Sequence, residues 1–280
     1  MNIFKTTILL TGLTLLLVLA GEYFGGESGA LLAFALAAAM NFFSYFYSDK
    51  LALRMYNAQP ATREALPRVY EIVERLTRNA GIPMPKIYVI PTASPNAFAT
   101  GRNPQHASVA VTQGILGLLT DDELEGVLAH ELGHVRNRDI LTSSIAATLA
   151  GAITILARMA FWFGGRRREG GLITSLLMLI LAPLAAMLIQ MWVSRTREFA
   201  ADASAAELTH NPYALASALE KISGMSRQVP LVASANSAHM FIIAPLLSGQ
   251  SFANLFSTHP PVQKRIERLI GRPSVYGSLQ

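Results

Sequence analysis

The sequence predicts a mainly α-helical integral membrane protein whose water-exposed part carries a small β-sheet. Hydrophobic residues make up 51% of the 280 positions and charged residues only 15%, against about 25% charged in typical globular domains. The mean hydropathy is correspondingly high, at +0.36. Long apolar segments that could cross a bilayer account for these values, and about four such segments can be marked out along the chain.

Two features of the composition limit the possible functions. The chain has no cysteine, which excludes disulfides, thiolate metal ligands and a cysteine nucleophile. The net charge is +5, and the basic residues are scattered rather than gathered in a stripe, so we expect no nucleic-acid partner. A basic balance beside apolar segments is instead typical of the cytoplasmic side of a membrane protein.

Residues 1–48 are predicted to form a transmembrane hairpin. Thr6–Gly21 and Ser28–Ser48 contain no charged residue, and only the short loop Glu22–Glu27 separates them. The second segment is long enough to cross a bilayer at about 1.5 Å per residue. Lys5 and the small residues near Ala20 are also typical of a cleaved signal peptide, but a second apolar segment directly downstream favours an uncleaved span.

Residues 49–139 have the composition of a soluble domain. Apolar residues at helical spacing, alternating β-branched runs and a Thr-x-x-Glu pattern indicate its elements. The predicted elements are a helix at Arg63–Ala80 capped by Gly81, strands at Lys86–Ile90 and Ala107–Thr112, and a helix that starts with a capping box at Thr120 and Glu123.

A second hydrophobic hairpin is predicted over residues 140–194, and residues 195–280 return to the polar domain. Ile140–Gly165 is apolar except for Arg158, and Gly170–Ser194 carries no charge. Further helices are expected at Asn211–Ser223 and Pro261–Leu269.

The distribution of lysine and arginine predicts that both termini and the polar domain face the cytoplasm. The loop Glu22–Glu27 has neither residue type, whereas Lys50, Arg54, Arg136 and Arg138 flank the polar block. The cluster 166–168 conflicts with this orientation, since its three arginines would lie outside if the second hairpin crossed fully. Either that hairpin enters the bilayer without crossing it, or the stronger bias of the first hairpin decides.

The motif His130-Glu131-Leu132-Gly133-His134 follows the capping box and carries the strongest functional signal. On a helix, two histidines four residues apart project from one face and can share a metal ion. Glu131 would then lie within reach of a water on that metal. This is the H-E-x-x-H signature of zinc proteases, in which the glutamate is the general base. The pattern alone can arise by chance, so it needs a partner elsewhere in the chain.

A catalytic zinc site keeps three protein ligands and an open position for water, so a third ligand is required. Glu198 and Asp202 are again four residues apart and closely follow the last apolar segment. We predict that Glu198 binds the metal and that Asp202 accepts the free N–H of a ligating histidine. His134 precedes Ile140 by about 9 Å of helix rise, and Glu198 follows Ser194 by about 6 Å. The site is therefore expected at the membrane surface, with the histidine helix running on into the bilayer.

The chain resembles the HtpX family of bacterial membrane metalloproteases, relatives of the CAAX prenyl endopeptidases, in three motifs: HELGH, SRTREFAADASAA and STHPP. The resemblance implies a zincin-like, gluzincin-type catalytic domain built from residues 49–139 and 195–280. It implies one zinc ion bound by His130, His134 and Glu198, with Glu131 as the base. It further implies cleavage of misfolded and membrane proteins at the bacterial inner membrane, in membrane quality control under stress.

Three further sets of residues are candidates for the site. His259, followed by two prolines, is predicted to donate to the oxyanion or to gate the zinc as a reversible ligand, unless it merely caps the last helix. Asn96, Ala97 and Phe98 are predicted to bind an extended peptide at an exposed strand edge, although Phe98 could equally be core. Asn137, about one turn beyond the second histidine, could support the site or simply end the helix.

Two alternatives fit parts of the pattern. A prenyl-protein (CAAX-type) endopeptidase uses the same metal chemistry, usually on a larger helical cage with more spans. A non-catalytic membrane scaffold would close a structural zinc with a fourth protein ligand, but Glu131 would then have no role. The expected partners are protein or peptide substrates, especially membrane proteins, and the lipid bilayer.

Overall fold

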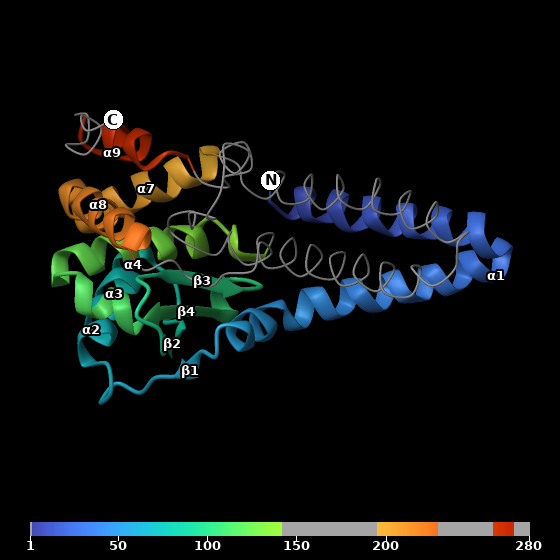
Figure 1. Cartoon of the computed structure of the whole chain (residues 1–280), viewed down its shortest axis with the longest axis horizontal. Helices are drawn as coiled ribbons and strands as arrows, with labels where there is room; N and C mark the ends of the chain where they lie inside the picture. The colour runs from blue at the N-terminus through green and yellow to red at the C-terminus, as the bar shows by residue number, and fades with distance from the viewer. Residues whose placement is uncertain (1, 142–194, 229–259, 272–280) are drawn as a thin grey trace.

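The computed structural model describes residues 2–141, 195–228 and 260–271 (Figure 1). A long helical hairpin extends from a body of helices and one sheet. Nearly all of the second hydrophobic hairpin predicted at 140–194 lies outside the described residues, and so does His259.

The hairpin is formed by α1 (Asn2–Met55), which folds back on itself at Gly26. Gly26 has φ 59° and ψ −151°, a conformation that favours glycine. The two arms touch, because Asn41 Nδ2 donates to Thr14 Oγ1 at 3.0 Å. The predicted helical hairpin is therefore present, with its turn inside the expected loop.

The described residues include part of the predicted set of membrane spans. Within the described residues, one helical stretch is long and apolar enough to cross a bilayer, the 23-residue Gly25–Tyr47. The first arm contains a shorter apolar stretch, Leu10–Leu19. The fold is thus mainly helical with a small sheet, as predicted, whereas four spans remain a prediction.

The sheet has the strand order β1-β2-β4-β3. β2 pairs with β4 in parallel, and β3 pairs with β4 antiparallel. The strands are β1 (Gln59–Pro60), β2 (Lys86–Ile90), β3 (Ala97–Gly101) and β4 (Ala107–Thr112). The predictions of β2 and β4 are confirmed; β4 lies in the middle of the sheet and is buried throughout, and its neighbour β3 is an edge strand whose side chains are mostly buried.

Helices cover one face of the sheet, and the end of α1 covers the other. Val109 and Val111 of β4 belong to the large core that the helices complete. Ala110 and Phe98 point to the opposite face, where they pack with Leu53 of α1. The helices of the body are α2 (Pro67–Ala80), α3 (Gln113–Leu118), α4 (Asp121–Arg136), α7 (Arg195–Thr209), α8 (Pro212–Gln228) and α9 (Val262–Ile270), with a 3₁₀ turn η1 at Pro104–His106.

α2 begins later than its apolar pattern predicts. Its first helical residue is Pro67 rather than Arg63, because proline suits the first turn of a helix and disfavours helical geometry in the residue before it. The C-terminal cap at Gly81, with φ 64°, is as predicted.

α4 carries the histidine motif, and its start is fixed by Glu123. The predicted capping box is present: Glu123 Oε2 accepts the Thr120 N–H at 2.9 Å, and Thr120 Oγ1 accepts the Glu123 N–H at 3.4 Å. Glu123 also accepts from Ser217 Oγ at 2.6 Å and Lys221 Nζ at 2.8 Å, which ties α8 to α4. Burial by itself raises the pKa of Glu123, but the hydrogen bonds from Lys221, Ser217 and Thr120 lower it to about 2.

The end of α4 contradicts the expectation that the histidine helix runs on into the bilayer. The helix ends at Arg136, and Arg138 has φ 57°. The Asp139 N–H donates to the His134 carbonyl at 2.9 Å, which turns the chain, and Ile140 is buried in the core. The turn brings Asp139 back beside His134.

We expect Glu123→Gln to destabilise the protein by about 1–2 kcal/mol at neutral pH, less than the shift in the pKa of Glu123 from 4.5 to about 2 would give, because Lys221 is partly exposed and solvent screens the pair. Because the folded-state pKa is depressed, this stabilisation is present above pH 4.5 and is lost as the pH falls toward 2. The difference in thermal unfolding temperature between the variant and the parent should therefore shrink between pH 5 and 3.

Glu125→Gln is the matched control, because Glu125 sits on the same helix and bonds Arg75 at 2.8 Å but is more exposed. A control change as large as that of Glu123→Gln, or a Glu123→Gln effect that is independent of pH, would contradict the assignment.

Candidate metal centre and active site

The two sequence motifs meet where α7 packs closely on α4. Gly133 allows this approach, because a Cβ there would lie 3.2 Å from Ser204 Cβ and 3.4 Å from the Ala201 backbone. Ala201 and Ala205 are fully buried, and their small side chains let α7 lie close to α4. Close packing brings Glu198 of α7 over the two histidines of α4.

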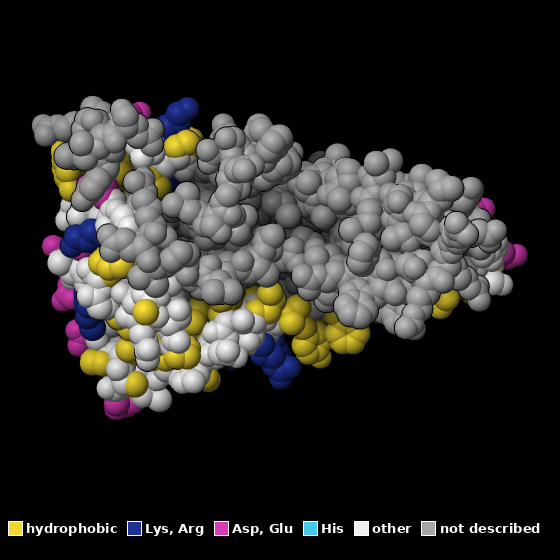
Figure 2. Space-filling view, in the orientation of Figure 1, with side chains coloured by type: hydrophobic (Ala, Val, Ile, Leu, Met, Phe, Trp, Pro, Cys, Tyr) yellow, Lys and Arg dark blue, Asp and Glu magenta, His cyan; other side chains and the backbone are white. Residues whose placement is uncertain are grey.

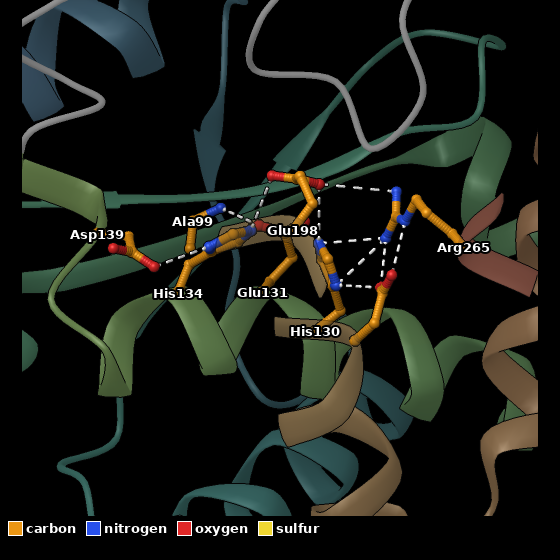
Figure 3. A network of polar contacts seen from close by, with 8 residues as sticks. Ala99, His130, Glu131, His134, Asp139, Glu198 and Arg265 are labelled. Carbon is orange, nitrogen blue, oxygen red and sulfur yellow. Dashed lines mark hydrogen bonds and ion pairs between the residues drawn. The ribbon is translucent and has the colours of Figure 1, made fainter. Parts of the chain in front are cut away.

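His130, His134 and Glu198 offer three ligand atoms that converge on one point (Figure 3). The Nε2 atoms of His130 and His134 lie 3.7 and 3.5 Å from the two carboxylate oxygens of Glu198. All three ligand atoms are within 4.8 Å of one another. Ligands of a tetrahedral zinc at about 2.0–2.1 Å are separated by about 3.4 Å, so this donor set fits such an ion.

The other nitrogen of each histidine faces a carboxylate. His130 Nδ1 lies 2.9 Å from Asp202 Oδ1, and His134 Nδ1 lies 3.4 Å from Asp139 Oδ2. Carboxylates in these positions hold the N–H on Nδ1 and leave Nε2 free to bind a metal. The position of Asp202 supports its predicted role as acceptor of a histidine N–H, which stays a prediction.

Protons compete with a metal for this site. Burial lowers the pKa of His134, but the hydrogen bond to Asp139 and the charges of Glu198 and Glu131 raise it to about 9. A ligating histidine must be neutral, so metal binding here releases a proton.

Glu131 points toward the same centre from α4 and is buried. Its Oε2 accepts the N–H of Ala99, in the edge strand β3, at 2.9 Å. Burial raises the pKa of Glu131, and the histidines and the Ala99 N–H oppose this rise. A raised pKa brings a carboxylate closer to the range in which it can accept and return a proton near neutral pH.

Arg265 of α9 is part of the site and was missed by the sequence analysis. It is completely buried, and it binds Asp202 with two hydrogen bonds, from Nη2 at 2.6 Å and Nε at 2.9 Å. Its Nη1 also lies 3.7 Å from Glu198 Oε2. Burial alone would raise the pKa of Asp202, but Arg265 and His130 hold it far below its usual value.

The sequence does contain a signal for Arg265. Val262, Ile266 and Leu269 form the apolar stripe of α9, and Arg265 falls on that stripe at helical spacing. A charge on the buried face of an amphipathic helix requires a partner in the core. The partner, Asp202, could not be identified without the tertiary structure.

The remaining predicted site residues are Asn96–Phe98 and Asn137, which the structure describes, and His259, which lies outside the described residues. Asn96 and Ala97 are buried at the start of β3, and the Phe98 ring packs in the core against Tyr56. Asn137 is exposed at the C-cap of α4, while Asp139 occupies the position beside His134. The roles of Asn96–Phe98, Asn137 and His259 stay predictions.

An H-E-x-x-H helix whose histidines meet a glutamate from a second helix defines a metallopeptidase centre. The comparisons with known proteins agree. The model of peptidase family M48 matches residues 63–272. A protease HtpX homolog of Persephonella marina is 54% identical over 289 aligned residues that cover 100% of both chains. A protease HtpX homolog of Thermococcus sibiricus is 52% identical and covers 95% of this chain and 94% of its own.

The chain therefore belongs to peptidase family M48, and it is a metalloprotease. The prediction of a membrane metalloprotease of the HtpX type is confirmed. The fold is also similar to a crystal structure of S. mikatae Ste24p, with a TM-score of 0.55 and 19% identity. That match covers 96% of this chain but 65% of the other, and at this identity it shows a shared fold alone.

We expect Arg265→Met to lower the stability of the purified protein by about 3–5 kcal/mol, because it leaves the Asp202 carboxylate buried without its main partner. Adding Asp202→Asn should restore part of the loss, since no unpaired buried charge then remains. Thermal unfolding in detergent measures both effects.

Arg268→Met is the control: Arg268 lies on the exposed side of the same helix, stacked on Phe199 at 4.6 Å. If the single Arg265 variant unfolds at the parent temperature, or the double variant is less stable than either single variant, the proposed pairing is wrong.

Proposed function

We propose that the protein is a zinc-dependent endopeptidase that cuts misfolded or membrane proteins at the cytoplasmic face of its own membrane. The observation that carries the proposal is the convergence of His130, His134 and Glu198 within 4.8 Å, with Glu131 directed to the same centre. Three nitrogen and oxygen donors leave a fourth tetrahedral position for water, as a catalytic zinc site requires.

The residues present divide the chemistry between them. A zinc ion held by this donor set would polarise the peptide carbonyl and lower the pKa of water toward 7. Glu131 accepts the proton of the attacking water and passes it to the leaving amine. The Ala99 N–H holds the Glu131 carboxylate in place, and Asp202 and Asp139 orient the histidines.

The edge strand β3 is the proposed binding surface for the substrate backbone. No strand pairs with its outer edge among the residues that the structure describes. The Ala99 N–H points to Glu131 and so away from β4, and alternate residues of a strand point the same way. Ala97 and Ala99 therefore present main-chain groups beside the base, where an extended peptide of almost any sequence can pair.

The membrane location is supported by the helix that joins the body to the hairpin. The apolar stretch Gly25–Tyr47 is exposed along most of its length, and Figure 2 shows hydrophobic side chains on its visible part beside basic ones near the body. Tyr45 and Tyr47 end the stretch, and Lys50 lies 5.1 Å from the Tyr47 ring. Aromatic residues followed by basic ones are typical of the cytoplasmic boundary of a span.

The fold shared with Ste24p keeps a prenyl-protein endopeptidase open as a second function, since the same metal chemistry would serve it. One assay with three substrates separates the two functions: casein, a membrane protein and a farnesylated peptide. Cleavage of the farnesylated peptide alone would favour the second function.

Glu131→Gln should retain zinc but lose casein cleavage by about 10²–10⁴-fold, because general acid–base catalysis contributes about that much and the amide cannot accept the proton. Glu198→Gln should lose both zinc and activity. Metal content is measured by mass spectrometry and cleavage by gel. The control is Glu207→Gln, an exposed carboxylate of α7 that pairs with Arg136. Retained cleavage in Glu131→Gln would refute the role of Glu131.

A chelator such as 1,10-phenanthroline should abolish casein cleavage by the full-length protein in detergent, and added zinc should restore it. Zinc should be lost to the chelator more readily at lower pH than at higher pH, because protons compete with the metal for His134, whose pKa is raised to about 9. If the metal-free protein cleaves as fast as the loaded one, the metal is structural.

A further inference from the structure

The edge strand β3 is held against α1 at both of its ends. At the start of the strand, the Phe98 ring lies 5.3 Å from the Tyr56 ring. Just past its end, the Arg102 guanidinium lies 5.5 Å from the centre of the Phe46 ring. Leu53, which packs in the same cluster as Phe98, is seven residues after Phe46 and so on the same side of the helix. The strand therefore lies along the last turns of α1 (Figure 1).

The contacts at the two ends fix the direction of β3 along α1, and the lengths of the two segments agree. From Phe46 to the end of α1 at Met55 the helix rises about 14 Å, and from Phe98 to Arg102 an extended chain covers about 13 Å. β3 therefore runs antiparallel to α1, and its C-terminal end points back toward the apolar stretch that ends at Tyr47.

The same contacts give the distance between the proposed catalytic centre and the membrane end of α1. Ala99, which donates to Glu131, is three strand residues before Arg102, a separation of about 10 Å. Arg102 lies at the level of Phe46, next to the last residue of the apolar stretch. The centre is thus about 10 Å beyond the membrane end of α1, or about three residues of extended chain.

We propose that α1 and β3 act together as a molecular ruler that sets where a membrane-anchored substrate is cut. Resting on the proposed function, this inference adds a distance and a direction. In this proposal the substrate pairs antiparallel to β3, and a substrate paired in this way runs away from the membrane in its N-to-C direction. The scissile bond therefore lies at least about three residues from the substrate's own membrane segment, and that segment precedes the bond.

The test uses the full-length enzyme in liposomes and a peptide stretch that it cuts within casein. This stretch is fused after a single membrane-spanning helix through Gly-Ser spacers of increasing length. Cut sites are mapped by mass spectrometry. We expect no cut closer than about three residues to the span, and cleavage that begins once the spacer exceeds that length.

A mirrored substrate places the same stretch before the span, with the same short spacer. It should be cut at least about tenfold more slowly, because the reversed chain cannot make the same main-chain pairs at this height. Cuts next to the span, equal rates for the two substrates, or no cutting of either while casein is cleaved would each overturn the inference. Failure to cleave casein would instead refute the proposed function, and the ruler with it.

Arg102→Ser tests the tether itself. It should leave casein cleavage unchanged, because Arg102 lies outside β3 and contacts α1, but it should spread the cut sites toward the span. Arg54→Ser, an exposed arginine on α1, is the matched control and should keep the parent pattern. An Arg102 variant with the parent distribution of cut sites would show that this contact does not set the distance.

Discussion

The close packing of α7 on α4 is the constraint on which the rest of the site depends. The three ligand atoms come from helices that are separated in the chain by residues 137–194, and only a short distance between the helix axes lets one carboxylate reach both histidines. Gly133 in one motif and Ala201 in the other supply that distance. These positions therefore have a packing role distinct from the ligand role of their neighbours.

Around this contact the protein places a set of charges that hold one another in position. Arg265 lies against Asp202, Asp202 against His130, and Asp139 against His134. A buried guanidinium is costly to desolvate, and its pairing with Asp202 recovers that cost only in one geometry. The same interaction docks α9 onto α7, so the last described helix is coupled to the orientation of His130, a proposed metal ligand.

The sheet connects the proposed catalytic residues to the helix that is proposed to cross the membrane. Its central strand β4 is buried on both faces, while β3 contacts Glu131, the proposed general base, on one side and the end of α1 on the other. β3 thus carries the proposed substrate-binding edge and contacts both the Glu131 carboxylate and α1, the helix that is proposed to enter the bilayer. Under the proposed function, this arrangement would favour substrates presented from the membrane surface over those that diffuse freely, because β3 has a fixed direction and a fixed distance from the membrane end of α1.

Short-range sequence patterns by themselves determined much of the structure of this protein. The spacing of His130 and His134 and the place of Glu198 after the last apolar segment predicted three side chains that converge in the structure. The Thr120 capping box fixed the start of the histidine helix, and the apolar hairpin was visible from composition alone. These features rest on interactions within a few residues, which a sequence displays directly. The tertiary structure alone decided that Arg265 pairs with Asp202, that β3 is the edge strand, and that α4 ends at Arg136 rather than continuing toward the bilayer. Each of these depends on contacts between distant segments, and hydrophobic periodicity carries no information about which segments meet.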